Sequence, residues 1–75
     1  GMSARRVVLI GYGAIAGDIA EALRVAREPG YALAVLLRPG SSSAGRVPED
    51  MPILDGPDAV AAFAPDLIIE AAGHG

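Results

Sequence analysis

A strand that runs directly into a cluster of glycines is the feature that most restricts the fold of this chain. The run RVVLI at 6–10 is followed at once by GYGAIAG at 11–17. Continuous β-branched and leucine residues are typical of a strand covered on both faces in a parallel sheet. Glycine costs about 0.5–1 kcal/mol in a regular element, so the cluster indicates that the backbone closely approaches another group.

A change of hydrophobic period follows the glycines. From Ala14 an apolar stripe recurs at helical spacing, with charged residues on the opposite side. The stripe consists of Ile15, Ile19, Leu23 and Ala26, and Ala16, Ala20 and Ala22 lie beside it. This pattern predicts an amphipathic helix. Proline and glycine at 29–30 are expected to end it.

The rest of the chain continues the alternation. Strands are predicted at 31–37 and 51–54 and in DLIIEAAG at 66–73, with a polar loop at 39–50 and a short helix at 58–64. Strands that alternate with helices are typical of a doubly wound parallel sheet with right-handed crossovers. We therefore predict an α/β fold, a Rossmann-type doubly wound parallel sheet that is truncated after about four strands.

Composition excludes several classes of protein. A hydrophobic fraction of 52% and a mean hydropathy of +0.42 exclude a disordered chain, and the lack of cysteine excludes disulfides and thiolate metal sites. No apolar run approaches the roughly 20 residues that cross a bilayer. The cationic residues are six scattered arginines in a chain of net charge −3, so no nucleic acid partner is expected. We expect a cytoplasmic protein without a membrane partner, in which Gly1 before Met2 remains from tag removal.

Each small residue of the Gly11-x-Gly13-x-x-Ala16 motif has a physical role at a dinucleotide site. Gly11 permits a tight turn, Gly13 lets a pyrophosphate approach the backbone, and Ala16 lets the helix pack close to the strand. The amides at the start of the helix would then face the phosphates. A glycine turn that merely packs tightly is the alternative interpretation.

The residues after the second expected strand bear on the choice of nucleotide. Sites that prefer NAD usually carry a carboxylate about 20 residues beyond the glycines. Here the strand ends in Arg38, and Ser41, Ser42 and Ser43 follow. A guanidinium and hydroxyl groups suit a phosphate, which favours NADP over NAD. A solvated arginine at the start of a loop is the alternative.

The end of the chain supplies a second group of candidate residues. Ligands of such folds lie outside the carboxyl ends of the strands, where Ala71, Ala72 and Gly73 would leave room for a cofactor. Glu70 and His74 are the titratable residues there. Glu70 is either an orienting or a solvated group, and His74 is either a base or a neighbour of the cofactor or substrate. No cluster of residues predicts a metal site.

Two segments carry a resemblance to a known family. LIGYGAIAGDIAEAL at 9–23 and PDLIIEAAGHG at 65–75 resemble the N-terminal half-domain of the L-aspartate dehydrogenases at the spacing of that family. The first segment is shared by many dehydrogenases, and the Glu-x-Ala-Gly-His pattern of the second is more specific. Ala16 departs from the glycine usual at its place, which alanine tolerates.

The resemblance implies that residues 1–75 belong to a longer protein, here called the parent protein. It also implies that the parent protein oxidises L-aspartate to iminoaspartate, with hydride transfer to NAD or NADP, in the route to nicotinamide cofactors. It also implies a homodimer and a later substrate domain, so that residues 1–75 are the first part of an NAD(P)-binding domain and inactive alone. Carried over by position, it places Gly11, Gly13, Ala14 and Ile15 at the pyrophosphate, and Ala72, Gly73 and His74 at the nicotinamide side.

Other functions stay open at this point. One is another oxidoreductase with a similar N-terminus, of the homoserine dehydrogenase or dihydrodipicolinate reductase type. A second, from a different class, is a non-catalytic module that senses nucleotides. The residues that follow 75 in the parent protein would distinguish these functions, because only the enzymes need a substrate domain.

Overall fold

Seven elements make up the part of the chain that the computed structural model describes, which is residues 4–25, 30–38 and 40–71. The helices and strands alternate as the sequence predicts. In chain order they are β1 (Arg5–Ile10), α1 (Ala14–Arg24), β2 (Tyr31–Leu36), the 3₁₀ helix η1 (Ser42–Arg46), β3 (Ile53–Leu54), α2 (Pro57–Phe63) and β4 (Leu67–Glu70).

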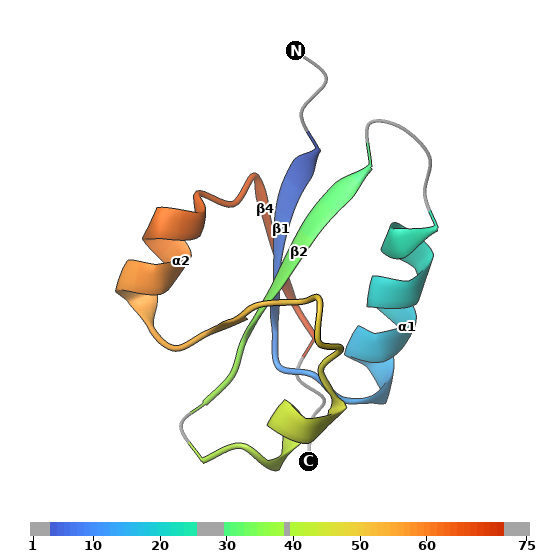
Figure 1. Cartoon of the computed structure of the whole chain (residues 1–75), viewed down its shortest axis with the longest axis vertical. Helices are drawn as coiled ribbons and strands as arrows, with labels where there is room; N and C mark the ends of the chain where they lie inside the picture. The colour runs from blue at the N-terminus through green and yellow to red at the C-terminus, as the bar shows by residue number, and fades with distance from the viewer. Residues whose placement is uncertain (1–3, 26–29, 39, 72–75) are drawn as a thin grey trace.

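The strands of the described residues form one parallel sheet in the order β3-β2-β1-β4. β1 lies inside the sheet, where Val7 pairs with Leu33 on one side and with Leu67 on the other. Val7, Val8 and Leu9 are fully buried, as a strand with both faces covered requires. Helices α1 and α2 lie on opposite sides of the sheet (Figure 1). The predicted α/β fold, a Rossmann-like doubly wound parallel sheet, is therefore confirmed.

Helix α1 packs through two of its alanines together with Ile19 and Leu23 of the predicted stripe, which contact the core. Ala16 and Ala20 are at most 1% exposed and belong to the core with Val7 and Leu9, whereas Ile15 is 60% exposed. Small side chains let the helix axis approach the sheet closely, while Ile15 at the start of the stripe lies outside this contact. The predicted inner face is therefore correct at Ile19 and Leu23 and wrong at Ile15.

The connection between β2 and β3 is more ordered than the predicted loop. It contains η1, which begins after Ser41, and it is tied to α1 by an ion pair between Arg24 and Asp50 with a nitrogen–oxygen distance of 2.7 Å. Met51 is buried in the core instead of extending β3, which is limited to Ile53–Leu54. The connection is therefore held against the α1 side of the fold.

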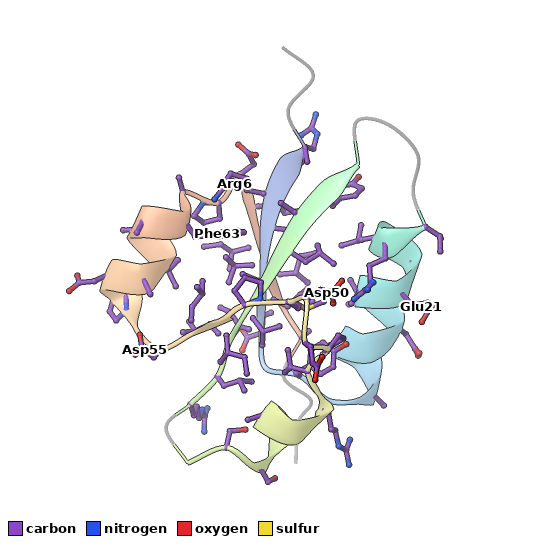
Figure 2. All side chains as sticks on the ribbon, in the orientation of Figure 1. Arg6, Glu21, Asp50, Asp55 and Phe63 are labelled. Carbon is purple, nitrogen blue, oxygen red and sulfur yellow. The ribbon has the colours of Figure 1, made fainter. Side chains whose placement is uncertain are left out.

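Arg6 joins three elements at the amino end of the sheet. Its backbone N–H donates to the Asp66 carboxylate at 2.9 Å, and its guanidinium donates to the Phe63 carbonyl. The guanidinium also lies over the Phe63 ring, 4.3 Å from the ring centre (Figure 2). These contacts tie β1 to the end of α2 and the start of β4. Neither helix of the described residues is long and apolar enough to cross a membrane.

Candidate functional site

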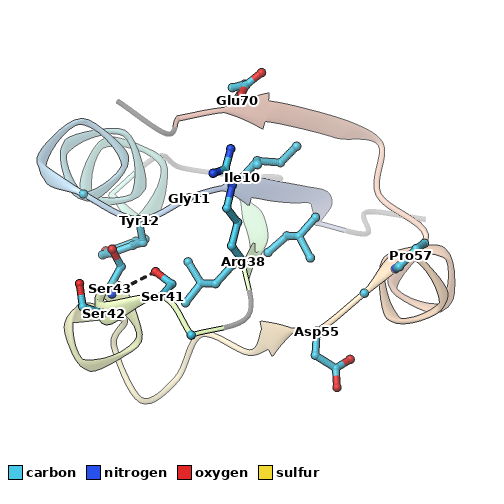
Figure 3. Close-up of a pocket in the computed structure, with 15 residues that line it drawn as sticks. Ile10, Gly11, Tyr12, Arg38, Ser41, Ser42, Ser43, Asp55, Pro57 and Glu70 are labelled. Atoms are coloured by element: carbon cyan, nitrogen blue, oxygen red, sulfur yellow. Dashed lines mark hydrogen bonds between the residues drawn. The ribbon is translucent and has the colours of Figure 1, made fainter. Parts of the chain in front are cut away.

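A pocket of about 830 Å³ lies at the carboxyl ends of the strands (Figure 3). Small-molecule sites typically have volumes of about 300–1,000 Å³, and open parallel sheets bind ligands at this edge. The pocket draws its walls from the turn after β1, the end of β2 with the following serines, the end of β3 and the end of β4. The residues that line it are Ile10, Gly11, Tyr12, Gly13, Leu36, Leu37, Arg38, Gly40, Ser41, Ser42, Ser43, Asp55, Gly56, Pro57 and Glu70.

The glycine turn adopts the backbone conformation that its sequence predicts. Gly11 has a φ of 86°, in the left-handed region that favours glycine, and its N–H donates to the Leu36 carbonyl at 2.9 Å. Gly13 has an ordinary φ of −113°, and a Cβ built on it would meet nothing within 4 Å. The glycine at position 13 therefore leaves open space beside the backbone, where a ligand can approach.

The start of α1 offers backbone donors to that space. Gly13 is the N-cap, no side chain caps the helix, and the first turn carries no acidic residue. The first amides of a helix lack intrahelical partners, and the helix dipole favours an anion there. The side chains of Ala14 and Ile15 are exposed, so their backbone is what they contribute, whereas Ala16 contributes close packing under the turn.

Tyr12 is a residue of the turn that sequence reasoning missed. Its side chain is 8% exposed and belongs to the hydrophobic core together with Ala16 and Met51. Figure 3 shows the ring lying on the side of the serines. A Cβ on Gly17 would lie 3.9 Å from the Tyr12 hydroxyl, an ordinary contact. A buried aromatic residue between the two glycines holds the turn in place.

Arg38, Ser41, Ser42 and Ser43 line the same pocket. The Ser41 N–H donates to the Arg38 carbonyl at 3.0 Å. The Ser41 hydroxyl oxygen accepts the Ser43 N–H at 3.1 Å, which leaves the hydroxyl proton available to a ligand. The exposed Arg38 side chain, however, extends toward Ile10 in Figure 3 rather than toward the serines. A joint contact with one phosphate needs a rotation of this side chain.

The ends of β3 and β4 add residues to the pocket that local sequence patterns do not reveal as partners. Asp55, Gly56 and Pro57 come from a segment expected only to turn into α2, and the Asp55 carboxylate points away from the pocket in Figure 3. Glu70 pairs in register with Ile10, next to the glycine turn. Their grouping follows from the strand order, which no single segment encodes.

Several predicted site residues cannot be placed. Ala72, Gly73 and His74 lie outside the described residues, while Ala71 is buried and its N–H donates to the Ile10 carbonyl at 2.9 Å. Within the described ranges no cluster of histidine, cysteine and acidic residues could hold a metal ion. Comparison with known proteins finds no protein family, no curated protein and no solved structure that matches the chain.

Proposed function

We propose that the chain binds NADP or NAD in this pocket and is the cofactor-binding part of an oxidoreductase. One observation carries the proposal. A single pocket at the carboxyl edge of the sheet joins an uncapped helix start and an open glycine to a wall of arginine and serine. A dinucleotide presents the complementary chemistry, an anionic pyrophosphate between two ribosyl groups.

The residues present fit the pyrophosphate. A Cβ at position 13 would stand in the open space beside the helix start, so the glycine keeps this space free for the ligand. The backbone amides of Ala14 and Ile15 would donate to the phosphate oxygens, supported by the helix dipole. The neighbouring Ile10 and Leu36 provide apolar surface beside the turn.

The end of β2 supports NADP as the preferred form. The strand is followed by Leu37 and Arg38, so no carboxylate stands where one would bind both ribose hydroxyls. Arg38, once rotated, and the Ser41 hydroxyl would hold a 2′-phosphate. A charge-assisted hydrogen bond contributes about 1.5–3 kcal/mol. This contribution corresponds to a preference for NADP over NAD of roughly tenfold to a hundredfold.

For the parent protein we propose an amino-acid dehydrogenase that acts on L-aspartate in the cytoplasm as a homodimer. The support is the resemblance of the segments at 9–23 and 65–75 to the L-aspartate dehydrogenases. The bound cofactor would supply the hydride acceptor, and this chain would bind and orient it. The amino acid would bind to a later domain of the parent protein, as the resemblance implies.

Calorimetric titration of the chain with NADP⁺ and with NAD⁺ tests the proposed site. We expect tighter binding of NADP⁺, and Arg38→Ala should remove most of that preference. Arg46→Ala is the matched control, because Arg46 lies on the same β2–β3 connection and does not line the pocket. Absence of binding of both nucleotides would refute the proposal, and tighter binding of NAD⁺ by the unmodified chain would refute the role of Arg38.

A further inference from the structure

Glu70 lies at one end of the pocket, and its carboxylate stands at the rim, on the outer side of β4 in Figure 3. Glu70 is the last residue of β4, it is exposed, and it pairs in register with Ile10, the residue before the glycine turn. The serines at 41–43 form what we call the serine wall of the pocket. Because β4 and β2 flank β1 on opposite sides, Glu70 and the serine wall lie on opposite sides of the turn (Figure 3). The pocket therefore has a carboxylate at its β4 rim and hydrogen-bond donors for a phosphate at its β2 end.

Glu70 forms no ion pair within the part of the chain that the structure describes. The ion pair found there joins Arg24 to Asp50, outside the pocket. Arg38 lines the pocket and extends toward Ile10, the strand partner of Glu70, but it forms no ion pair with Glu70 within 4 Å. If Arg38 turns toward a phosphate at the serine wall, Glu70 remains the charge at the β4 end.

The difference between the β2 end and the β4 end of the pocket determines the orientation expected for a bound dinucleotide. With its phosphate-bearing adenosine half at Arg38 and Ser41, and its pyrophosphate at the turn after β1, the nicotinamide half would extend toward the end of β4. This step rests on the proposed function. It brings the nicotinamide ring to the side of the pocket where Glu70 lies.

We infer that Glu70 makes the site prefer the oxidised over the reduced cofactor. The oxidised nicotinamide ring carries one positive charge, which is lost when the ring accepts a hydride, that is, a proton with two electrons. A carboxylate at the rim attracts the charged ring and not the neutral one. For a solvent-exposed pair several ångströms apart this attraction corresponds to about a three- to tenfold difference in affinity. Glu70 is thus a specificity-determining residue for the redox state of the cofactor.

The test is the ratio of the dissociation constants for NADP⁺ and NADPH, measured by calorimetry on the unmodified chain and on Glu70→Gln. We expect Glu70→Gln to weaken NADP⁺ about three- to tenfold and to leave NADPH nearly unchanged. Higher ionic strength should reduce this effect, because salt screens exposed charges. Glu49→Gln is the matched control, since it makes the same chemical change at an exposed residue that does not line the pocket.

The possible outcomes separate this inference from the proposed site. Binding of both forms with an unchanged ratio in Glu70→Gln overturns the inference and leaves the dinucleotide site standing. An equal change of the ratio in Glu49→Gln also overturns it, because net charge would then be the cause. Failure of the unmodified chain to bind either form overturns the proposed function, and the role of Glu70 with it.

Discussion

Replacing Gly13 by valine should abolish nucleotide binding while leaving the stability of the fold nearly unchanged. Gly13 has φ −113° and ψ −153°, an extended conformation outside the left-handed region that only glycine favours, and a Cβ there meets nothing within 4 Å. Valine lowers the entropy of the unfolded chain, which stabilises the fold by about 0.4–1 kcal/mol. It is also a poorer N-cap than glycine, an effect of similar size and opposite sign. We therefore expect the free energy of unfolding to change by less than about 1 kcal/mol.

The expected loss of binding is much larger. The branched side chain would fill the space beside the start of α1, where the pyrophosphate approaches the backbone amides. Loss of two charge-assisted hydrogen bonds costs about 3–6 kcal/mol. The affinity for NADP⁺ should then fall at least a hundredfold. A small change in stability would thus accompany a large loss of binding.

Two measurements on the same samples test this prediction. Urea unfolding followed by circular dichroism gives the stability, and calorimetry gives the dissociation constant. Gly45→Val is the control, because a Cβ on Gly45 also meets nothing within 4 Å and this residue does not line the pocket. A folded Gly13→Val protein that binds NADP⁺ as well as the unmodified chain does would refute the proposed role of the turn.

Three further predictions concern stability and activity. Arg24→Ala should lower the free energy of unfolding by at most about 1 kcal/mol, because the Arg24 and Asp50 side chains are 43% and 66% exposed, and the difference should shrink in high salt. Asp66→Ala should cost about 1 kcal/mol in urea unfolding, because the Arg6 N–H loses its carboxylate acceptor, and an unchanged midpoint would contradict this. The chain alone should form no NADPH from L-aspartate and NADP⁺, whereas the parent protein should form it. The absorbance of the reduced cofactor measures the reaction in each case.

Local sequence patterns predicted the elements around the turn well. The apolar run of β1 implied a strand buried on both faces, and Val7, Val8 and Leu9 are fully buried. Gly11 was expected in a tight turn and has a φ of 86°. These features depend on neighbouring residues alone, so they could be inferred without knowledge of the rest of the fold.

The inward face of α1, by contrast, depended on packing. Helical periodicity groups Ile15 with Ile19 and Leu23, yet Ile15 is exposed, whereas Ile19 and Leu23 pack against the core beside the buried Ala16 and Ala20. Periodicity identifies an apolar side of a helix but not the distance at which the helix packs. The packing of the helix on the core requires small side chains at Ala16 and Ala20, and this distance exists only in the folded chain.

The composition of the pocket was likewise decided by tertiary structure. The sequence by itself determined the glycine turn, the arginine and serine segment and the acidic residue after the last apolar run. Only the strand order brings Glu70 beside Ile10, which is 60 residues earlier in the chain, and only the crossover to α2 adds Pro57. Strand order is set by how crossovers cover both faces of the sheet, a property of the whole chain and not of any one segment.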